Sequence, residues 1–278
     1  TQEIFQNNAI VSQVYIEVLP NNIVGFIKLV RKLRNENIDV LFSCLPSELM
    51  NLAFLTSMAR PKLSLKHAGN YENERYRNLD FVYSHLLPCD LRRHRTELNL
   101  DFLRFLGEEI SNDVHYPKVF INNDVKKGMS QEKYTILNNE TDFIAIHAGG
   151  LRKYKHWDWE KYAALCKIIL KHGYKILLIG GNAEMEDNGK IMQRIGNPNV
   201  INFTGILSLQ ETLALLSYTK LLISNDTGIM HAAAAINKPV IALFGPTDHR
   251  HIGPRGKDIH IIKKGENMGM PSGISLFI

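Results

Sequence analysis

The feature that most constrains this chain is the alternation of short apolar runs with helical patterns from residue 143 to residue 244. Strands are expected at 143–147, 175–179, 200–203, 221–224 and 240–244. The helices expected between them include one closed by Gly173 and one opened by a capping box of Ser208 and Glu211. Because strands that alternate with helices form parallel sheets, the second half is predicted to be a doubly wound α/β domain.

The first half shows the same character with less regularity. Strands are expected at 14–19 and 39–45, and helices at 24–33, 49–58 and 98–106. Residues 114–139 interrupt the pattern with Pro117, Gly128 and scattered charges, which is typical of a linker. We therefore expect two domains, residues 1–125 and 126–278.

Composition narrows the class of protein. The net charge of +5 and the pI near 9.0 suit anionic ligands such as phosphates or an acidic membrane surface, but the surplus is too small to indicate nucleic acid. The three cysteines are widely spaced and form no C-x-x-C, so neither a disulfide framework nor a zinc site is indicated. No run approaches the length of a membrane span and no signal-peptide pattern opens the sequence. A cytoplasmic protein, soluble or peripheral, is expected.

The strongest local signal is the segment 223–235, where a strand leads through a polar turn into an alanine-rich helix. Four candidate binding residues fall within about one turn: Asp226, Thr227, Gly228 and His231. Free N–H groups at a helix start bind phosphate, and ligands of open parallel sheets bind at the carboxyl ends of strands. The alternative is that Asp226 and Thr227 only cap the helix and that His231 packs in the core. The combination, with a Gly-Pro-Thr-Asp loop at 245–248, favours a ligand site.

A second candidate segment runs from residue 144 to residue 157. A strand leads into Gly149 and Gly150 and then into a basic stretch, and such a loop can wrap a diphosphate through backbone N–H groups. Arg152 and Lys153 are expected to form a solvated face. Gly180-Gly181 follows the next strand, but G-x-G-x-x-G is absent, so no NAD site is predicted.

The stretch from Asp226 to Asp248 resembles the signature of glycosyltransferase family 9, the lipopolysaccharide heptosyltransferases. Asp-Thr-Gly, a His three residues later, an alanine-rich helix, Pro239 and Phe-Gly-Pro-Thr-Asp stand in the family's order. Weaker similarity continues upstream through 208–211, 175–181 and Lys155-His156-Trp157. The resemblance implies an α/β fold of the GT-B type, with two Rossmann-like doubly wound domains facing a cleft and the donor on the C-terminal one.

The resemblance also implies an activity and its partners. The reaction is inverting transfer of a heptose from ADP-heptose to the lipopolysaccharide core, with no metal or other cofactor required. The implied partners are a nucleotide sugar and a lipid-linked oligosaccharide acceptor, with peripheral contact at the cytoplasmic face of the inner membrane and no nucleic acid. Lys155 would neutralise the leaving diphosphate, Asp226 would orient sugar hydroxyls, and Glu184, or else Glu186, would meet the ribose. The alternative for both glutamates is that they only suit the positive end of a helix.

The catalytic base is the part of the family pattern without a counterpart. Members begin with a strand and a Gly-rich loop whose Asp is the proposed base, and no residue here matches it. The base is therefore expected before Thr1, and the sequence is expected to be a truncated chain; Glu48 and Asp90 stay open as substitutes. Two other functions stay open: a nucleotide-sugar 2-epimerase, and a remnant that binds the nucleotide without transferring sugar.

Overall fold

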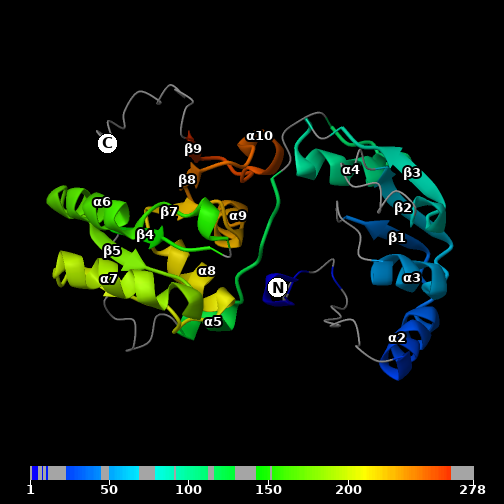
Figure 1. The fold of residues 1–278 in the computed structure, drawn as a ribbon, viewed down its shortest axis with the longest axis horizontal. Coiled ribbons are helices and arrows are strands. Elements are labelled where there is room, and N and C mark those ends of the chain that lie inside the picture. Colours follow the sequence, from blue (N-terminus) through cyan, green and yellow to red (C-terminus); the bar gives the residue numbers. More distant parts are fainter. Residues whose placement is uncertain are drawn as a thin grey trace. The chain divides into compact units, whose positions relative to one another are not determined.

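The computed structural model describes these residues of the chain: 2–5, 8, 11, 23–44, 50–68, 79–90, 92–111, 116–128, 142–150 and 152–263. Contacts within the chain divide it into two compact units, a larger one of Thr1–Val14 with His115–Ile278 and a smaller one of Tyr15–Val114. The strand expected at 14–19 lies outside the described residues. Each unit is an α/β structure (Figure 1).

Among its described residues, the larger unit forms a parallel sheet of six strands. They are β4 (Phe143–His147), β5 (Lys175–Leu178), β6 (Val200–Asn202), β7 (Leu221–Asn225), β8 (Val240–Phe244) and β9 (Ile259–Lys263). Their order is β6-β5-β4-β7-β8-β9, so the direction of winding reverses between β4 and β7. This is the doubly wound order predicted for the second half, and the reversal creates a topological switch point. The strand β9 was not predicted from the sequence.

Helices cover both faces of this sheet because successive strand residues point to opposite sides. On one face, α6 (Trp159–Lys171) and α7 (Met185–Ile195) pack on Ile144, Ile146 and their neighbours. On the other, α8 (Leu209–Ser217) and α9 (Gly228–Ala235) pack on Phe143, Ala145 and their neighbours. The four alanines at the end of α9 are buried, as expected of a helix pressed closely onto a sheet.

Two local predictions at helix ends are confirmed. Ser208 Oγ accepts from the backbone N–H of Glu211 at 3.2 Å, and the Glu211 side chain accepts from the backbone N–H of Ser208 at 2.8 Å. Gly173, after α6, has φ of +83°, in the region that favours glycine.

The smaller unit has three described parallel strands in the order β1 (Val40–Ser43), β2 (Leu63–Ala68) and β3 (His85–Pro88). Its helices α2 (Ile23–Asn35), α3 (Met50–Ala59) and α4 (Arg95–Phe105) confirm the three predicted from helical spacing. Leu65, Leu87 and Phe102 form a buried hydrophobic cluster in this unit, and the ring of Phe42 stacks on that of Phe102 with centroids 5.1 Å apart.

The division into units differs from the expected boundary at residue 125. The described part of the expected linker contains a short helix, α5 (Asn123–Gly128), and belongs to the larger unit. The backbone N–H of Asn122 donates to Gln210 Oε1 of α8 at 2.9 Å, and Gln210 Nε2 donates to the carbonyl of Glu3 in α1 (Gln2–Phe5) at 2.6 Å. Most buried polar groups are hydrogen-bonded, and here the buried Gln210 bonds to both segments and joins them to α8.

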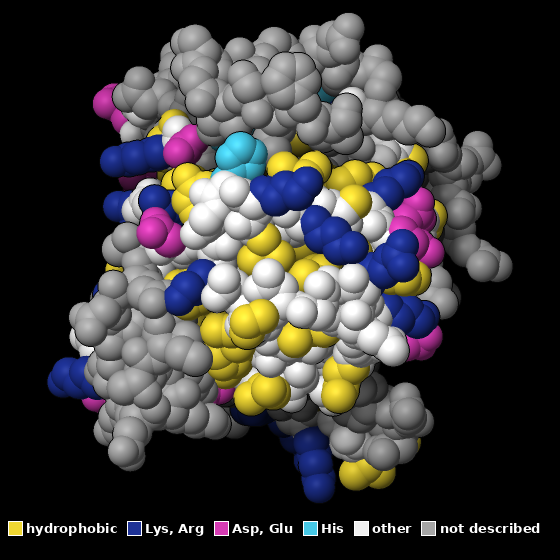
Figure 2. Space-filling model, turned by 90° about the vertical axis from the view of Figure 1, so that its left-hand side faces the viewer, with side chains coloured by type: hydrophobic (Ala, Val, Ile, Leu, Met, Phe, Trp, Pro, Cys, Tyr) yellow, Lys and Arg dark blue, Asp and Glu magenta, His cyan; other side chains and the backbone are white. Residues whose placement is uncertain are grey.

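On the one face of the molecule drawn in Figure 2, the positively charged side chains of the described residues are spread out and form no single patch. Several of these Lys and Arg side chains have Asp or Glu side chains nearby, and hydrophobic side chains appear between them in small groups. Within the described residues, no helix combines the length and the apolar character needed to cross a bilayer.

Candidate functional site

The candidate residues lie at the switch point of the larger sheet. β4 and β7 are neighbours there, with His147 opposite Ser224, and both strands end at this edge. The loop containing Gly149 and Gly150 leaves β4, and Asp226 follows β7 directly. The predicted site thus falls where open parallel sheets bind their ligands.

Lys155 and Asp226, 71 residues apart in the sequence, form an ion pair at the centre of this edge. Lys155 Nζ lies 2.6 Å from Asp226 Oδ2, and the two side chains are 19% and 5% exposed. Thr247 Oγ1, from the Gly-Pro-Thr-Asp loop after β8, donates to the same oxygen at 2.7 Å. Two loops predicted separately therefore meet at one carboxylate. A lysine ammonium has three N–H donors, and Asp226 occupies one of them.

The start of α9 is open. Thr227 is the N-cap residue, but its side chain makes no capping hydrogen bond, and its hydroxyl lies 3.1 Å from that of Ser224. Gly228 is exposed, and apart from its chain neighbours and the backbone of its own helix, nothing lies within 4 Å of the position that a Cβ would take there. The alternative in which the Thr227 side chain only caps the helix is therefore wrong. A helix start without a side-chain cap is suited to an anion.

His231 lies one turn into α9 on its exposed side. The alternative in which it packs in the core is wrong, because the side chain is exposed while the alanines that follow are buried. Although the residue is exposed to solvent on one side, the atoms packed around its imidazole desolvate it and lower the pKa of His231; Asp226 opposes this shift and the Lys155 ammonium adds to it. A pKa lowered below 6.5 leaves the imidazole mostly uncharged at pH 7, so it can form hydrogen bonds in its uncharged form.

Glu184 joins the loops after β4 and β5. Its Oε1 accepts from the backbone N–H of Gly150 at 3.2 Å and its Oε2 from that of Gly181 at 2.8 Å. A Cβ on Gly149 would lie only 1.9 Å from Glu184 Cγ, and Gly150 has φ of +149°. Gly149 is thus required by the close approach of Glu184. Gly150 is required by its backbone conformation and by Thr227 Cγ2, which would lie 2.8 Å from a Cβ there. The Gly150 N–H, which was expected to face a phosphate, is bonded to Glu184 in this structure.

The other residues singled out in the sequence have surroundings of different kinds. Glu186 is 80% exposed and pairs with Lys190 at 2.6 Å, so Glu184 and not Glu186 lies between the loops. Arg152 is exposed, and the side chain of Lys153 lies outside the described residues. Asp90, in the smaller unit, is bonded to Arg92, which lowers the pKa of its carboxyl to about 2. Glu48 lies outside the described residues.

Three residues at this edge were missed by the sequence reasoning. His156 lies beside Gly150, with Nε2 2.7 Å from its carbonyl oxygen. His147 ends β4 and is 8% exposed; burial lowers its pKa, and its Nδ1 makes no hydrogen bond to the described residues. Asn225 is fully buried beside Asp226. A polar residue at the end of an apolar strand was the signal for His147 and Asn225.

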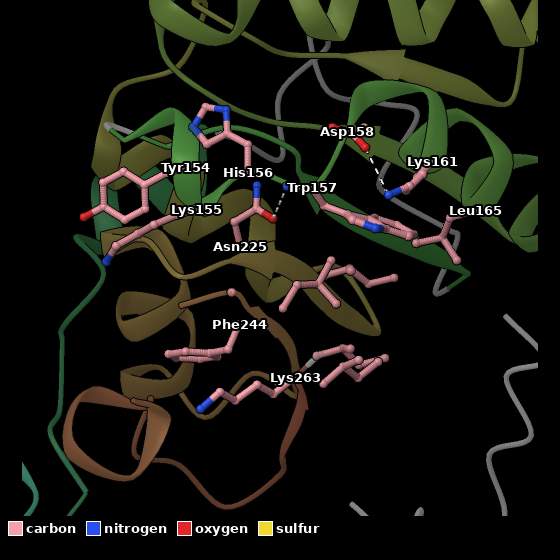
Figure 3. Close-up of a pocket in the computed structure, with 15 residues that line it drawn as sticks. Tyr154, Lys155, His156, Trp157, Asp158, Lys161, Leu165, Asn225, Phe244 and Lys263 are labelled. Atoms are coloured by element: carbon pink, nitrogen blue, oxygen red, sulfur yellow. Dashed lines mark hydrogen bonds and ion pairs between the residues drawn. The ribbon is translucent and has the colours of Figure 1, made fainter. Parts of the chain in front are cut away.

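A cavity of about 450 Å³ lies next to these residues, on the face of the sheet opposite α9. Figure 3 shows Trp157 and Leu165 together on one side of it, while Lys155 extends away from them beside Tyr154. Lys155 and Asn225 line this cavity, whereas Asp226, Gly228 and His231 do not. The cavity is therefore adjacent to the switch-point site and shares Lys155 and Asn225 with it. Among the described residues, no three His, Cys, Asp or Glu side chains are grouped as metal ligands.

Comparison with known proteins places this geometry in a family. A curated relative, lipooligosaccharide heptosyltransferase 2 of Haemophilus influenzae, is 31% identical over 136 residues, which are 48% of this chain and 39% of that protein. The matched stretch is thus well under two thirds of that relative's length.

Solved structures show the same fold. The glycosyl transferase family 9 structure from Veillonella parvula matches with a TM-score of 0.79 and 19% identity over 94% of this chain and 74% of that chain. The ADP-heptose lps heptosyltransferase II of E. coli matches with a TM-score of 0.68 and 21% identity over 84% of this chain and 71% of that chain. These likenesses confirm the predicted α/β fold of the GT-B type. The family model of glycosyltransferase family 9 (heptosyltransferase) matches residues 26–272, so this chain belongs to that family.

Proposed function

We propose that the larger unit binds the diphosphate of an ADP-sugar at the β4–β7 switch point and that the chain serves the transfer of a heptose to a lipopolysaccharide core acceptor. The observation that carries the proposal is the Lys155–Asp226–Thr247 cluster beside the open start of α9. It supplies a cation with free donor capacity next to backbone N–H groups, and both are suited to a diphosphate.

The chemistry assigns different roles to these groups. As the bond between the anomeric carbon and the diphosphate oxygen breaks, negative charge collects on the departing diphosphate. The Lys155 ammonium and the N–H groups at Gly228 would stabilise that charge. The neutral imidazole of His231 would add a hydrogen bond from the next turn of α9.

Asp226 is not suited to removing the acceptor's proton. Its Oδ2 already accepts hydrogen bonds from Lys155 and from Thr247, so this oxygen is engaged with protein groups. We assign Asp226 to holding Lys155 and to orienting sugar hydroxyls. The family match supports a heptosyl transferase and does not favour the epimerase alternative.

Calorimetric titration with ADP, and with AMP as the matched ligand that lacks the second phosphate, tests the binding site. We expect ADP to bind more tightly than AMP and to raise the melting temperature, because a ligand that binds only the folded state stabilises it. The absence of any ADP binding at millimolar concentration would overturn the proposal.

Labelled ADP-heptose tests the reaction. Turnover that requires a truncated lipopolysaccharide acceptor supports transfer. Turnover without an acceptor would instead indicate an epimerase, and ADP binding without turnover would indicate the nucleotide-binding remnant.

A further inference from the structure

The side-chain amide of Asn225, at the switch point, makes four hydrogen bonds. Its Nδ2 donates to the carbonyl oxygens of Ala148 at 2.9 Å and Gly149 at 3.1 Å. Its Oδ1 accepts from the backbone N–H of Trp157 at 3.3 Å, drawn in Figure 3, and from the hydroxyl of Tyr162 at 2.8 Å. Only this orientation of the amide matches two carbonyls on one side and an N–H on the other.

These four bonds join segments that are far apart in the sequence. Ala148 and Gly149 begin the loop that leaves β4, Trp157 lies two residues after Lys155, and Tyr162 is fully buried in α6. Asn225 itself is fully buried and immediately precedes Asp226. One side chain thus connects the glycine loop, the turn that carries Lys155, and the strand that carries its partner.

We propose that Asn225 is a positioning residue for the diphosphate site. All four of its amide hydrogen bonds are made to protein groups; by fixing the backbone at Gly149 and Trp157 it would hold Lys155 at Asp226 before the nucleotide arrives. The inference rests on the proposed function and adds to it the residue that preforms the site. A preformed site binds more tightly, because less order has to be created on binding.

The substitution Asn225→Asp tests this role with almost no change in shape. One carboxyl oxygen can still accept from Trp157 and Tyr162, but the other faces the carbonyls of Ala148 and Gly149 and cannot donate while ionised. We expect the affinity for ADP at pH 8 to fall roughly tenfold or more, because two buried carbonyl groups near the site lose their hydrogen-bond donor. The affinity for adenosine should change much less.

The pH dependence of the ADP affinity of Asn225→Asp gives a second measurement. A residue with a purely structural role would not change this pH dependence. The introduced carboxyl is buried against two carbonyl oxygens, which favours its protonated form, and once protonated it can donate again. The ratio of variant to wild-type ADP affinity should therefore rise toward one as the pH is lowered from 8 to 5.5, with the wild type measured at each pH.

Asn188→Asp is the matched control. Asn188 is also fully buried in the larger unit, and its Nδ2 donates to Thr204 Oγ1 at 2.7 Å, away from the segments that Asn225 joins. We expect this substitution to lower thermal stability while leaving the ADP affinity within about twofold of wild type. A twofold change in affinity corresponds to less free energy than one hydrogen bond contributes. Equal losses of ADP affinity in Asn188→Asp and Asn225→Asp would overturn the inference.

A double-mutant cycle with Lys155→Met completes the test. If Asn225 acts through Lys155, removing the ammonium should cost much less ADP affinity in the Asn225→Asp background than in wild type. Additive losses, or wild-type affinity in a folded Asn225→Asp protein, would overturn the inference. If Asn225→Asp does not fold, Asn225→Ser, which keeps one hydroxyl, replaces it with the same expectation. A wild-type protein that binds no ADP would overturn the proposed function itself.

Discussion

Replacing Lys155 by methionine probes the ion pair at the centre of the site while keeping most of the aliphatic stem. The substitution removes the ammonium that lies 2.6 Å from Asp226 Oδ2 and leaves a carboxylate only 5% exposed. Breaking a fully buried pair by removing one partner costs about 3–5 kcal/mol. Here Thr247 still donates to the same oxygen, and the 19% exposure of Lys155 lets water approach the vacated place. We expect a loss of about 1–3 kcal/mol in the free energy of unfolding.

Urea unfolding at pH 7, followed by circular dichroism, measures this loss. The matched control is Lys161→Met, because Lys161 pairs with Asp158 at 3.0 Å while both side chains are more than half exposed. Surface pairs contribute little, so the control should remain within about 0.5 kcal/mol of wild type. Equal stabilities of Lys155→Met and Lys161→Met would refute the reasoning, since the Lys155–Asp226 pair would then be no stronger than a solvated one.

Three further outcomes are expected. Gly149→Ala should displace the Glu184 side chain and lower stability, since its Cβ would lie 1.9 Å from Glu184 Cγ. Gly189→Ala in α7 is its control: a Cβ there would meet nothing within 4 Å beyond its chain neighbours and its own helix backbone, so the change should stabilise by about 0.5–1 kcal/mol in the same urea assay. Burial holds the pKa of His147 below its ordinary 6.5, so the unfolded state binds more protons than the folded state as the pH falls. The free energy of unfolding should therefore fall as the pH drops through 6.5, and it should fall less steeply in His147→Gln. Burial raises the pKa of the Cys166 thiol to about 12, so a thiol reagent should label it only after denaturant is added; labelling of the native protein would contradict this burial.

Much of the fold could be predicted because its signals are local. Apolar periodicity at 143–147, 175–179 and 240–244 specifies strands through residues that are neighbours along the chain. The capping box at Ser208 and the glycine after α6 mark helix ends for the same reason. The helices of the smaller unit were predicted from spacing alone. β9 was missed because residues 259–263 carry no flanking helical pattern that would have marked a strand.

Sequence by itself determined where the chemistry-bearing residues lie along the chain, and their placement after parallel strands determined that they would gather at one edge of a sheet. Tertiary structure alone decided their partners: Lys155 with Asp226 and Thr247, Glu184 with the Gly150 N–H, and Asn225 with the loop after β4. It also decided that residues 116–128 pack with the larger unit. The physical reason is that periodicity records only which side of an element is buried. A hydrogen bond between two loops depends on how the strand ends meet, and only the assembled sheet determines that.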